Sequence, residues 1–167
     1  MQEEVVRCSC CGELVAANNI ELVLRRPDEI AGMDEQEVVQ RCKFNDDIYI
    51  LDDNRFFLRC TIPLPVRGGT ERYSIGAWAE LTQDQFQKVW DLWEEEDLTT
   101  EPPMEAKLAN TIPLTDHSLN CSVQIRLIGA STRPEIFIAD THCSLYEEQN
   151  SGIPAHRASE YSDLIRA

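Results

Sequence analysis

The residues best suited to chemistry stand near the start of the chain, in Arg7-Cys8-Ser9-Cys10-Cys11-Gly12-Glu13. Cys8 and Cys11 have the Cys-x-x-Cys spacing, and the glycine directly after them permits a tight turn. Two thiolates from one turn can supply half of a tetrahedral zinc site, or they can form a redox pair. We therefore take Cys8 and Cys11 as the candidate metal ligands, with Zn as the implied ion and Cys10 as a spare thiol.

The other half of a zinc site is not evident in the sequence. There is no second Cys-x-x-Cys and no His-x-x-x-His. Completion would need isolated residues that folding brings close, such as Cys42, Cys60 or His142. Three interpretations stay open: a bound zinc, a redox pair and an unliganded turn. The sequence favours the unliganded turn, because the missing half argues against zinc and no thioredoxin-like βαβ pattern flanks the thiols.

A second dense cluster is Asp140-Thr141-His142-Cys143. A thiol, an imidazole and a carboxylate can form a nucleophilic triad. However, neighbours along a strand or at a helix start point in different directions. We expect instead that Asp140 or Thr141 caps a helix that begins at Cys143. No catalytic residue is assigned.

The remaining polar clusters predict no chemistry. Several acids flank one short strand and are expected to be solvated turn residues rather than a cation site; they are Asp46, Asp47, Asp52 and Asp53. Asp116-His117 reads as a surface turn. The sequence has neither a phosphate-binding glycine loop nor a nucleophile elbow. An enzyme is therefore unsupported, and we lean toward a non-enzymatic protein.

Charge narrows the choice of partner. The chain has 167 residues and a net charge of −15, from 30 acidic and 15 basic side chains. This field repels phosphate backbones and anionic membranes, so nucleic-acid and membrane binding are disfavoured. It permits a basic protein partner. The chain shows no signal-peptide pattern and no run of about 20 apolar residues, so we expect a cytoplasmic protein. In a reducing compartment the scattered Cys42, Cys60, Cys121 and Cys143 are expected to be buried thiols.

The middle of the chain predicts an antiparallel sheet and one packed helix. Residues 48–51 and 55–62 are β-rich runs joined by a turn of Asp and Asn, and a third strand is expected over 73–81. Thr82 then opens a Thr-x-x-Gln capping box. Apolar residues follow at helical spacing, so a helix is predicted over about 82–95, with its aromatic face on the sheet; the spaced residues are Phe86, Val89, Trp90 and Trp93.

The remainder predicts three further strands near 106–112, 119–128 and 135–139, then helices over 143–149 and from Pro154 to Arg166. Without a repeat or a low-complexity linker, residues 1–167 are expected to form a single α+β domain. Its parts are an antiparallel sheet with a packed amphipathic helix (about 82–95), a small N-terminal Cys knuckle within residues 1–19, and C-terminal helices in a tail over 143–167.

Taken in this order, the segments resemble the bacterial family DUF2199. The resemblance covers nearly the whole chain and rests on the stretches Cys8 to Gly12, Asp47 to Asp52, Arg55 to Arg59, Ile75 to Leu81, Glu101-Pro102-Pro103, Arg133 to Ile136 and His142 to Gly152. The family pattern often places a histidine after the Cys-Gly turn, where this chain has Leu14 and Val15. The resemblance implies a fold and no activity.

The leading hypothesis is a small non-enzymatic cytoplasmic protein that acts through contacts with an unidentified protein partner. One alternative is an acidic inhibitor or immunity-type protein that neutralises a basic partner, with association accelerated by charge. The other is a zinc-binding or thiol-redox protein that uses Cys8 and Cys11.

Overall fold

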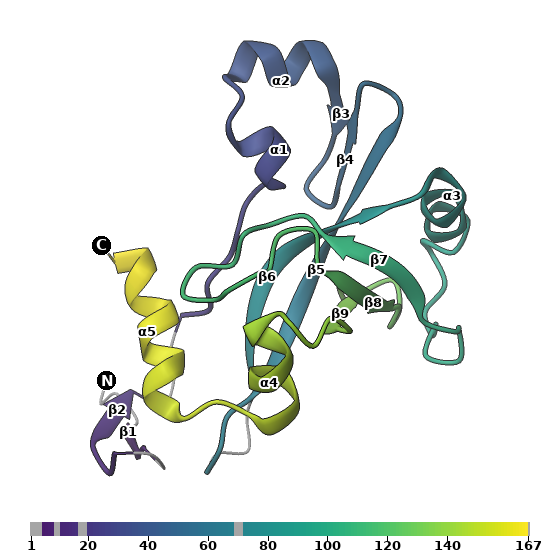
Figure 1. The fold of residues 1–167 in the computed structure, drawn as a ribbon. Coiled ribbons are helices and arrows are strands. Elements are labelled where there is room, and N and C mark those ends of the chain that lie inside the picture. The colour runs from purple at the N-terminus through teal and green to yellow at the C-terminus, as the bar shows by residue number, and fades with distance from the viewer. Residues whose placement is uncertain (1–4, 9–10, 17–19, 69–71, 167) are drawn as a thin grey trace.

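The computed structural model of the protein describes residues 5–8, 11–16, 20–68 and 72–166. Its elements combine a separate N-terminal hairpin, a larger sheet and several helices (Figure 1). In chain order they are β1 (Val5–Arg7), β2 (Leu14–Ala16), α1 (Asp28–Ala31), α2 (Glu35–Arg41), β3 (Cys42–Phe44), β4 (Ile48–Leu51), β5 (Arg55–Pro65), β6 (Arg72–Leu81), α3 (Gln83–Asp91), β7 (Met104–Leu108), β8 (Ser122–Arg126), β9 (Glu135–Ile138), α4 (Ser144–Ser151) and α5 (Ala155–Arg166).

Within the described part of the chain, the strands β5 to β9 close into a five-stranded barrel. Successive strands pair antiparallel, and the barrel closes where Thr61 of β5 lies parallel to Glu135 of β9. The predicted antiparallel sheet is therefore correct for neighbouring strands but wrong as an open sheet. The long, twisted β5 and β6 coil the sheet, which returns β9 to β5.

Alternation along β5 and β6 creates two hydrophobic cores. One set of side chains fills the barrel and includes Leu58, Cys60, Ile62, Ile75 and Ala77, all with no exposed surface. The opposite set contributes Phe57 and Trp78 to a second core beneath α1 and α2, with Ile30, Val38 and Tyr49. Both faces of the central strands are thus buried, which fixes their register.

Helix α3 begins as predicted but ends early. Thr82 and Gln85 form the complete capping box. The helix ends at Asp91 rather than near residue 95, because the acidic run over 94–97 is unfavourable at the negative end of the helix dipole. Phe86 and Val89 are buried, but Trp90 is 58% and Trp93 39% exposed. The prediction that the whole aromatic face packs on the sheet is therefore wrong for the two tryptophans.

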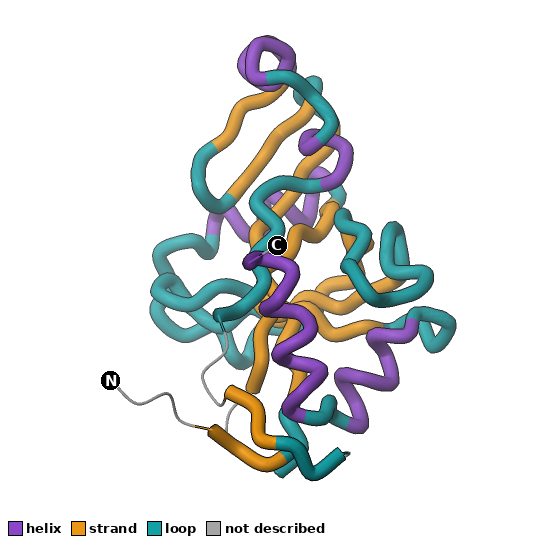
Figure 2. Tube along the Cα trace, turned by 90° about the vertical axis from the view of Figure 1, so that its left-hand side faces the viewer, coloured by secondary structure: helices purple, strands orange, loops and turns teal. Residues whose placement is uncertain are grey.

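The predicted C-terminal helices are present as α4 and α5. α4 is fixed to the barrel closure by the buried Gln149, whose side chain bonds Pro63 of β5 and both Ile136 and Ile138 of β9. α5 lies beside the β1–β2 hairpin in both views (Figures 1 and 2). The N-terminal hairpin and the C-terminal helix are therefore neighbours. None of the helices in these residue ranges has the length and apolar character needed to cross a bilayer.

Candidate metal centre

The β1–β2 hairpin holds two thiols at its turn. Cys8 follows β1 directly, and its amide donates to the carbonyl of Glu13 (2.8 Å) while its carbonyl accepts from the amide of Gly12 (2.9 Å). Gly12 has a φ of +73°, a left-handed conformation that a side chain would disfavour. The glycine thus permits the tight turn between Cys11 and β2. Cys8 is buried, whereas Cys11 is exposed.

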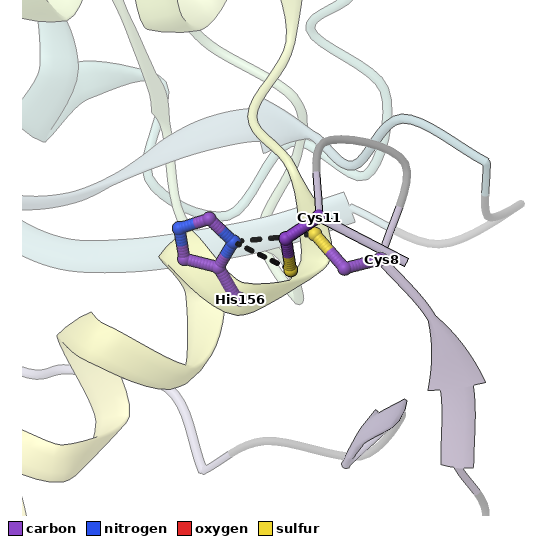
Figure 3. A group of neighbouring side chains, drawn as sticks. All are labelled: Cys8, Cys11 and His156. Atoms are coloured by element: carbon purple, nitrogen blue, oxygen red, sulfur yellow. Dashed lines mark hydrogen bonds between the residues drawn. The ribbon is translucent and has the colours of Figure 1, made fainter. Parts of the chain in front are cut away.

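Helix α5 brings an imidazole to this turn from the other end of the chain. The helix starts directly after Pro154 and is anchored by the fully buried Tyr161, whose ring stacks on Tyr73. The Tyr161 hydroxyl donates to Glu148 of α4 (2.8 Å). These contacts fix the orientation of α5, and His156 in its first turn points at Cys8 and Cys11 (Figure 3).

The three side chains converge on a common point. His156 Nδ1 lies 3.2 Å from the sulfur of Cys8 and 3.8 Å from that of Cys11. The potential ligand atoms all lie within 4.8 Å of one another. A zinc ion about 2.3 Å from sulfur and about 2.0–2.1 Å from nitrogen, in a tetrahedron, would place sulfur and nitrogen about 3.6 Å apart. The observed distances lie on either side of that value.

A carboxylate contacts the nitrogen of the imidazole that faces away from the thiols. His156 Nε2 lies 3.2 Å from Oε1 of Glu160, four residues later on α5. A proton on Nε2 satisfies this contact and leaves the lone pair of Nδ1 directed at the thiols. Histidines that bind metals commonly have such a carboxylate on the second nitrogen. The arrangement can therefore hold a metal ion, although it equally places a base beside a thiol.

The structure brings Cys8 and Cys11 together with a residue that the sequence reasoning missed. The residues considered for completing the site lie elsewhere: Cys42 and Cys60 are in the two cores, and His142 is exposed. Cys10 lies outside the described residues. A signal for His156 was present, because a helix was predicted after Pro154 and Glu160 follows the histidine at i+4.

The cluster at residues 140–143 does not form a triad. Cys143 is 1% exposed and shares a hydrogen bond with Cys121, whereas His142 is exposed. The predicted cap is also wrong, since Cys143 is the N-cap of α4 and makes no side-chain cap bond. The carboxylate of Asp140 instead accepts from the amide of His142 (2.9 Å). A tight turn before α4 explains these residues.

The turn acids and the buried thiols also lack a metal-like arrangement. Asp52 pairs with Arg41 and Asp53 with Lys43. Within residues 5–8, 11–16, 20–68 and 72–166, Cys8, Cys11 and His156 are the one convergent group of three such ligands. Burial raises the pKa of the Cys60 thiol, and burial next to Cys143 raises the pKa of Cys121 to about 12. Those thiols stay protonated at neutral pH.

Comparison with known proteins gives a family without an assigned activity. No curated protein and no solved structure matches the chain. One family model, described as an uncharacterized protein conserved in bacteria, matches residues 7–153, which include Cys8 and Cys11 but end before His156. This match confirms the resemblance noted from the sequence: the chain belongs to the bacterial family DUF2199.

Proposed function

We propose that the protein binds one zinc ion through Cys8, Cys11 and His156, and that the ion fastens the β1–β2 hairpin to α5. The observation that supports this proposal is the convergence of two sulfurs and one imidazole nitrogen from segments 148 residues apart in the sequence. Thiolate and imidazole are the donors that zinc prefers in proteins.

Two features favour a metal over thiol catalysis. A nucleophilic cysteine needs one sulfur paired with a base, whereas here two sulfurs approach the same nitrogen. In addition, Cys8, which lies nearer to the imidazole, is only 2% exposed and is enclosed by its own turn. A substrate would not reach it, but a small ion held at the turn would.

The position of the site indicates a structural role. The hairpin strands have three residues each, and Val5 and Leu14 are 54% and 62% exposed. An isolated two-stranded sheet is at best marginally stable in water. A zinc ion would add a link between the hairpin and α5. Structural sites usually have four protein ligands, and Cys10 is the fourth candidate that the sequence offers nearby.

Metal analysis of the purified full chain tests the proposal. We expect one zinc per chain by atomic emission, with two thiols that become reactive only after a chelator is added. Cys8→Ser and His156→Asn should lose the zinc. His142→Asn, a change at an exposed histidine outside the cluster, should keep it. Cys10→Ser shows whether the fourth ligand is that sulfur or a water molecule.

Two outcomes would reject zinc. A metal-free chain in which Cys8 and Cys11 readily form a disulfide, as shown by mass spectrometry, would support the redox alternative. A metal-free chain with ordinary, reduced thiols would leave a non-liganded turn. Retention of zinc in both Cys8→Ser and His156→Asn would place the ion elsewhere.

A second candidate function, binding of a basic protein partner, is favoured by the exposed end of α3. Trp90 stands 58% exposed, and it shares a hollow with Asn45, Ile48, Trp93 and three acids, Asp91, Glu94 and Glu95. Aromatic side chains are common binding anchors at protein interfaces, and the acids would attract a cationic segment. We propose that this acidic α3 surface docks a basic segment carrying an apolar anchor.

Binding of a labelled peptide of alternating Lys and Leu residues tests the acidic α3 surface. We expect the association rate to fall steeply with added salt, and Trp90→Ala to weaken affinity roughly tenfold, as for a modest interface anchor. The control is Leu119→Ala, an exposed apolar residue outside the hollow. Equal association rates at low and high salt, or unchanged affinity in Trp90→Ala, would exclude this function.

A further inference from the structure

A cavity separate from the metal centre lies where the barrel closes. Its volume is about 520 Å³, within the range of roughly 300–1,000 Å³ for small-molecule sites. The cavity is bounded by β5, the start of β6, the C-terminal end of α3 and the loop between β8 and β9. The sequence predicted no chemistry for these residues, which are scattered between positions 47 and 135.

Two kinds of residue line the cavity. The basic side, as we call the part formed by β5, β6 and the end of the β8–β9 loop, includes Arg59, Arg72 and Arg133. The apolar side, the part formed at the end of α3 and by the segment after it, includes Leu92, Trp93 and the buried Leu98. Binding pockets for small molecules commonly combine an apolar wall with a few polar groups that fix orientation.

Among the described residues, two of the three arginines that line the cavity are not paired with a carboxylate. Among the lining residues, three arginines face two carboxylates, Asp47 and Glu135, and Glu135 is already paired with Arg72 at 3.0 Å. Neither Arg59 nor Arg133 has a carboxylate within 4.0 Å in the described part of the chain, although acids outnumber bases two to one overall. Arg59 Nη1 donates to the backbone carbonyl of Asp46, at 3.3 Å.

Backbone contacts hold both sides in place. The amide of Thr61 donates to the carbonyl of Pro134 (2.9 Å), so Arg133 is fixed beside the strand that carries Arg59. On the apolar side, the amide of Leu98 donates to Ile128 (2.9 Å), and that of Ala130 donates to Glu95 (2.9 Å). Since these contacts join the loop to β5 on one side and to the segment after α3 on the other, the cavity is preformed.

A glycine completes the apolar side. The backbone of Gly129 lies against that of Glu96, so closely that a Cβ on Gly129 would come 2.1 Å from the Glu96 carbonyl oxygen. Only glycine permits this approach without displacing the loop. The absence of a side chain at Gly129 therefore allows the β8–β9 loop to pack against the segment after α3.

We propose that this cavity binds a small organic anion, with a carboxylate or phosphate head on Arg59 and Arg133 and an apolar, ring-bearing body against Trp93 and Leu92. Arginine suits such a head because its planar fork donates two parallel hydrogen bonds to carboxylate or phosphate oxygens. Thr61, Ser131 and Thr132 also line the cavity, from β5 and the β8–β9 loop, and a hydroxyl can donate to the remaining oxygens.

Titrations followed by amide chemical shifts test the site with three probes: phenyl phosphate, inorganic phosphate and phenol. We expect phenyl phosphate to shift the amides of residues 59–61 and 129–135, inorganic phosphate to bind roughly tenfold more weakly, and phenol not to bind. Arg59→Gln and Arg133→Gln should each weaken phenyl phosphate binding roughly tenfold. Arg126→Gln, on β8 over the ring of Phe137 and outside the cavity, is the matched control.

A further variant separates the head from the body. Trp93→Ala should weaken phenyl phosphate binding and leave inorganic phosphate binding unchanged. Each variant's amide spectrum shows whether its fold is intact. Equal binding of phenyl phosphate to wild type, Arg59→Gln and Arg133→Gln would overturn the proposal, and so would binding of phenol as tight as that of phenyl phosphate.

Discussion

The barrel and the N-terminal hairpin differ in how far their apolar side chains are exposed, among those that the structure describes. In the barrel, side chains such as Leu58 and Ile62 are completely buried, and the closure of β5 on β9 leaves the core enclosed. In the hairpin, Val5 and Leu14 are 54% and 62% exposed, and Cys8 next to β1 contacts His156 of α5. Buried apolar side chains hold the barrel together, whereas Cys8 and Cys11 at the turn of the hairpin lie beside His156 of α5.

The largest effect is expected from a truncation inside the barrel. Leu58→Ala should destabilise the protein by about 2–5 kcal/mol, because it removes buried methyl groups and leaves a cavity. Leu14→Ala in the hairpin should change the free energy of unfolding by less than about 0.5 kcal/mol. Urea unfolding followed by circular dichroism measures both. Equal losses in the two variants would show that the hairpin is part of the main hydrophobic core.

Removal of the metal should destabilise the β1–β2 hairpin rather than the barrel. If the proposed zinc is bound, its loss forfeits about 2.7 kcal/mol when free zinc had been about 100 times its dissociation constant. We expect this loss to be local, so hydrogen exchange should accelerate at the amides of Cys8 and Gly12 after chelation. The amides of β5 should keep their protection. Equal acceleration in β5 would mean that hairpin and barrel unfold as one unit.

A smaller effect should come from the carboxylate behind the imidazole. Glu160→Gln should weaken zinc affinity by about 10–100-fold, because the amide cannot orient and polarise His156 as the carboxylate does. Competition with a zinc-sensitive dye measures the change. Glu147→Gln on α4, at an exposed carboxylate that accepts a hydrogen bond from Ser151, is the matched control. An unchanged affinity in Glu160→Gln would argue that Nδ1 of His156 does not bind the ion.

The sequence predicted the elements that depend on residues close together in the chain, and not the contacts between distant residues. Local signals were sufficient for the β4–β5 hairpin, for the start of α3 at Thr82 and for the helix after Pro154. Each depends on residues a few positions apart. The barrel closure at Thr61 and Glu135 depends on the accumulated twist of long strands, which no short pattern encodes. Trp90 lies within α3 and is still 58% exposed, because helical spacing identifies an apolar face but not whether another element covers it.

The candidate metal centre was likewise predictable only in part from the sequence. Cys8 and Cys11 were identified because only two residues separate them, and the spacing itself is the signal. His156 was missed because it lies 148 residues from Cys8 and meets it only through the docking of α5 by Tyr161. Long-range convergence of this kind requires the tertiary structure. Arg59 and Arg133, which line the cavity where the barrel closes, were missed for the same reason.

The smallest effect concerns the outer layer of the molecule, where Arg41 of α2 forms two hydrogen bonds to Asp52, of 3.0 and 2.6 Å. These bonds hold the pKa of Asp52 below its ordinary value of 3.8. Because the folded-state pKa is lowered, the pair stabilises the fold above about pH 4, and this contribution is lost as pH falls through the folded value. Both groups are exposed, so the effect is small and screened by salt.

Asp52→Asn isolates this term, because asparagine tolerates the left-handed backbone that Asp52 adopts, with a φ of 52°. The difference in unfolding midpoint between wild type and Asp52→Asn should be constant from about pH 5 to 8 and should shrink below about pH 4. Arg41→Gln should show the same pH dependence relative to wild type, and the double variant should add nothing to it. A difference that persists unchanged at pH 2 would assign the effect to the backbone of the turn. In that case the outer layer, like the barrel, would be held by its packing and turn geometry rather than by its charges.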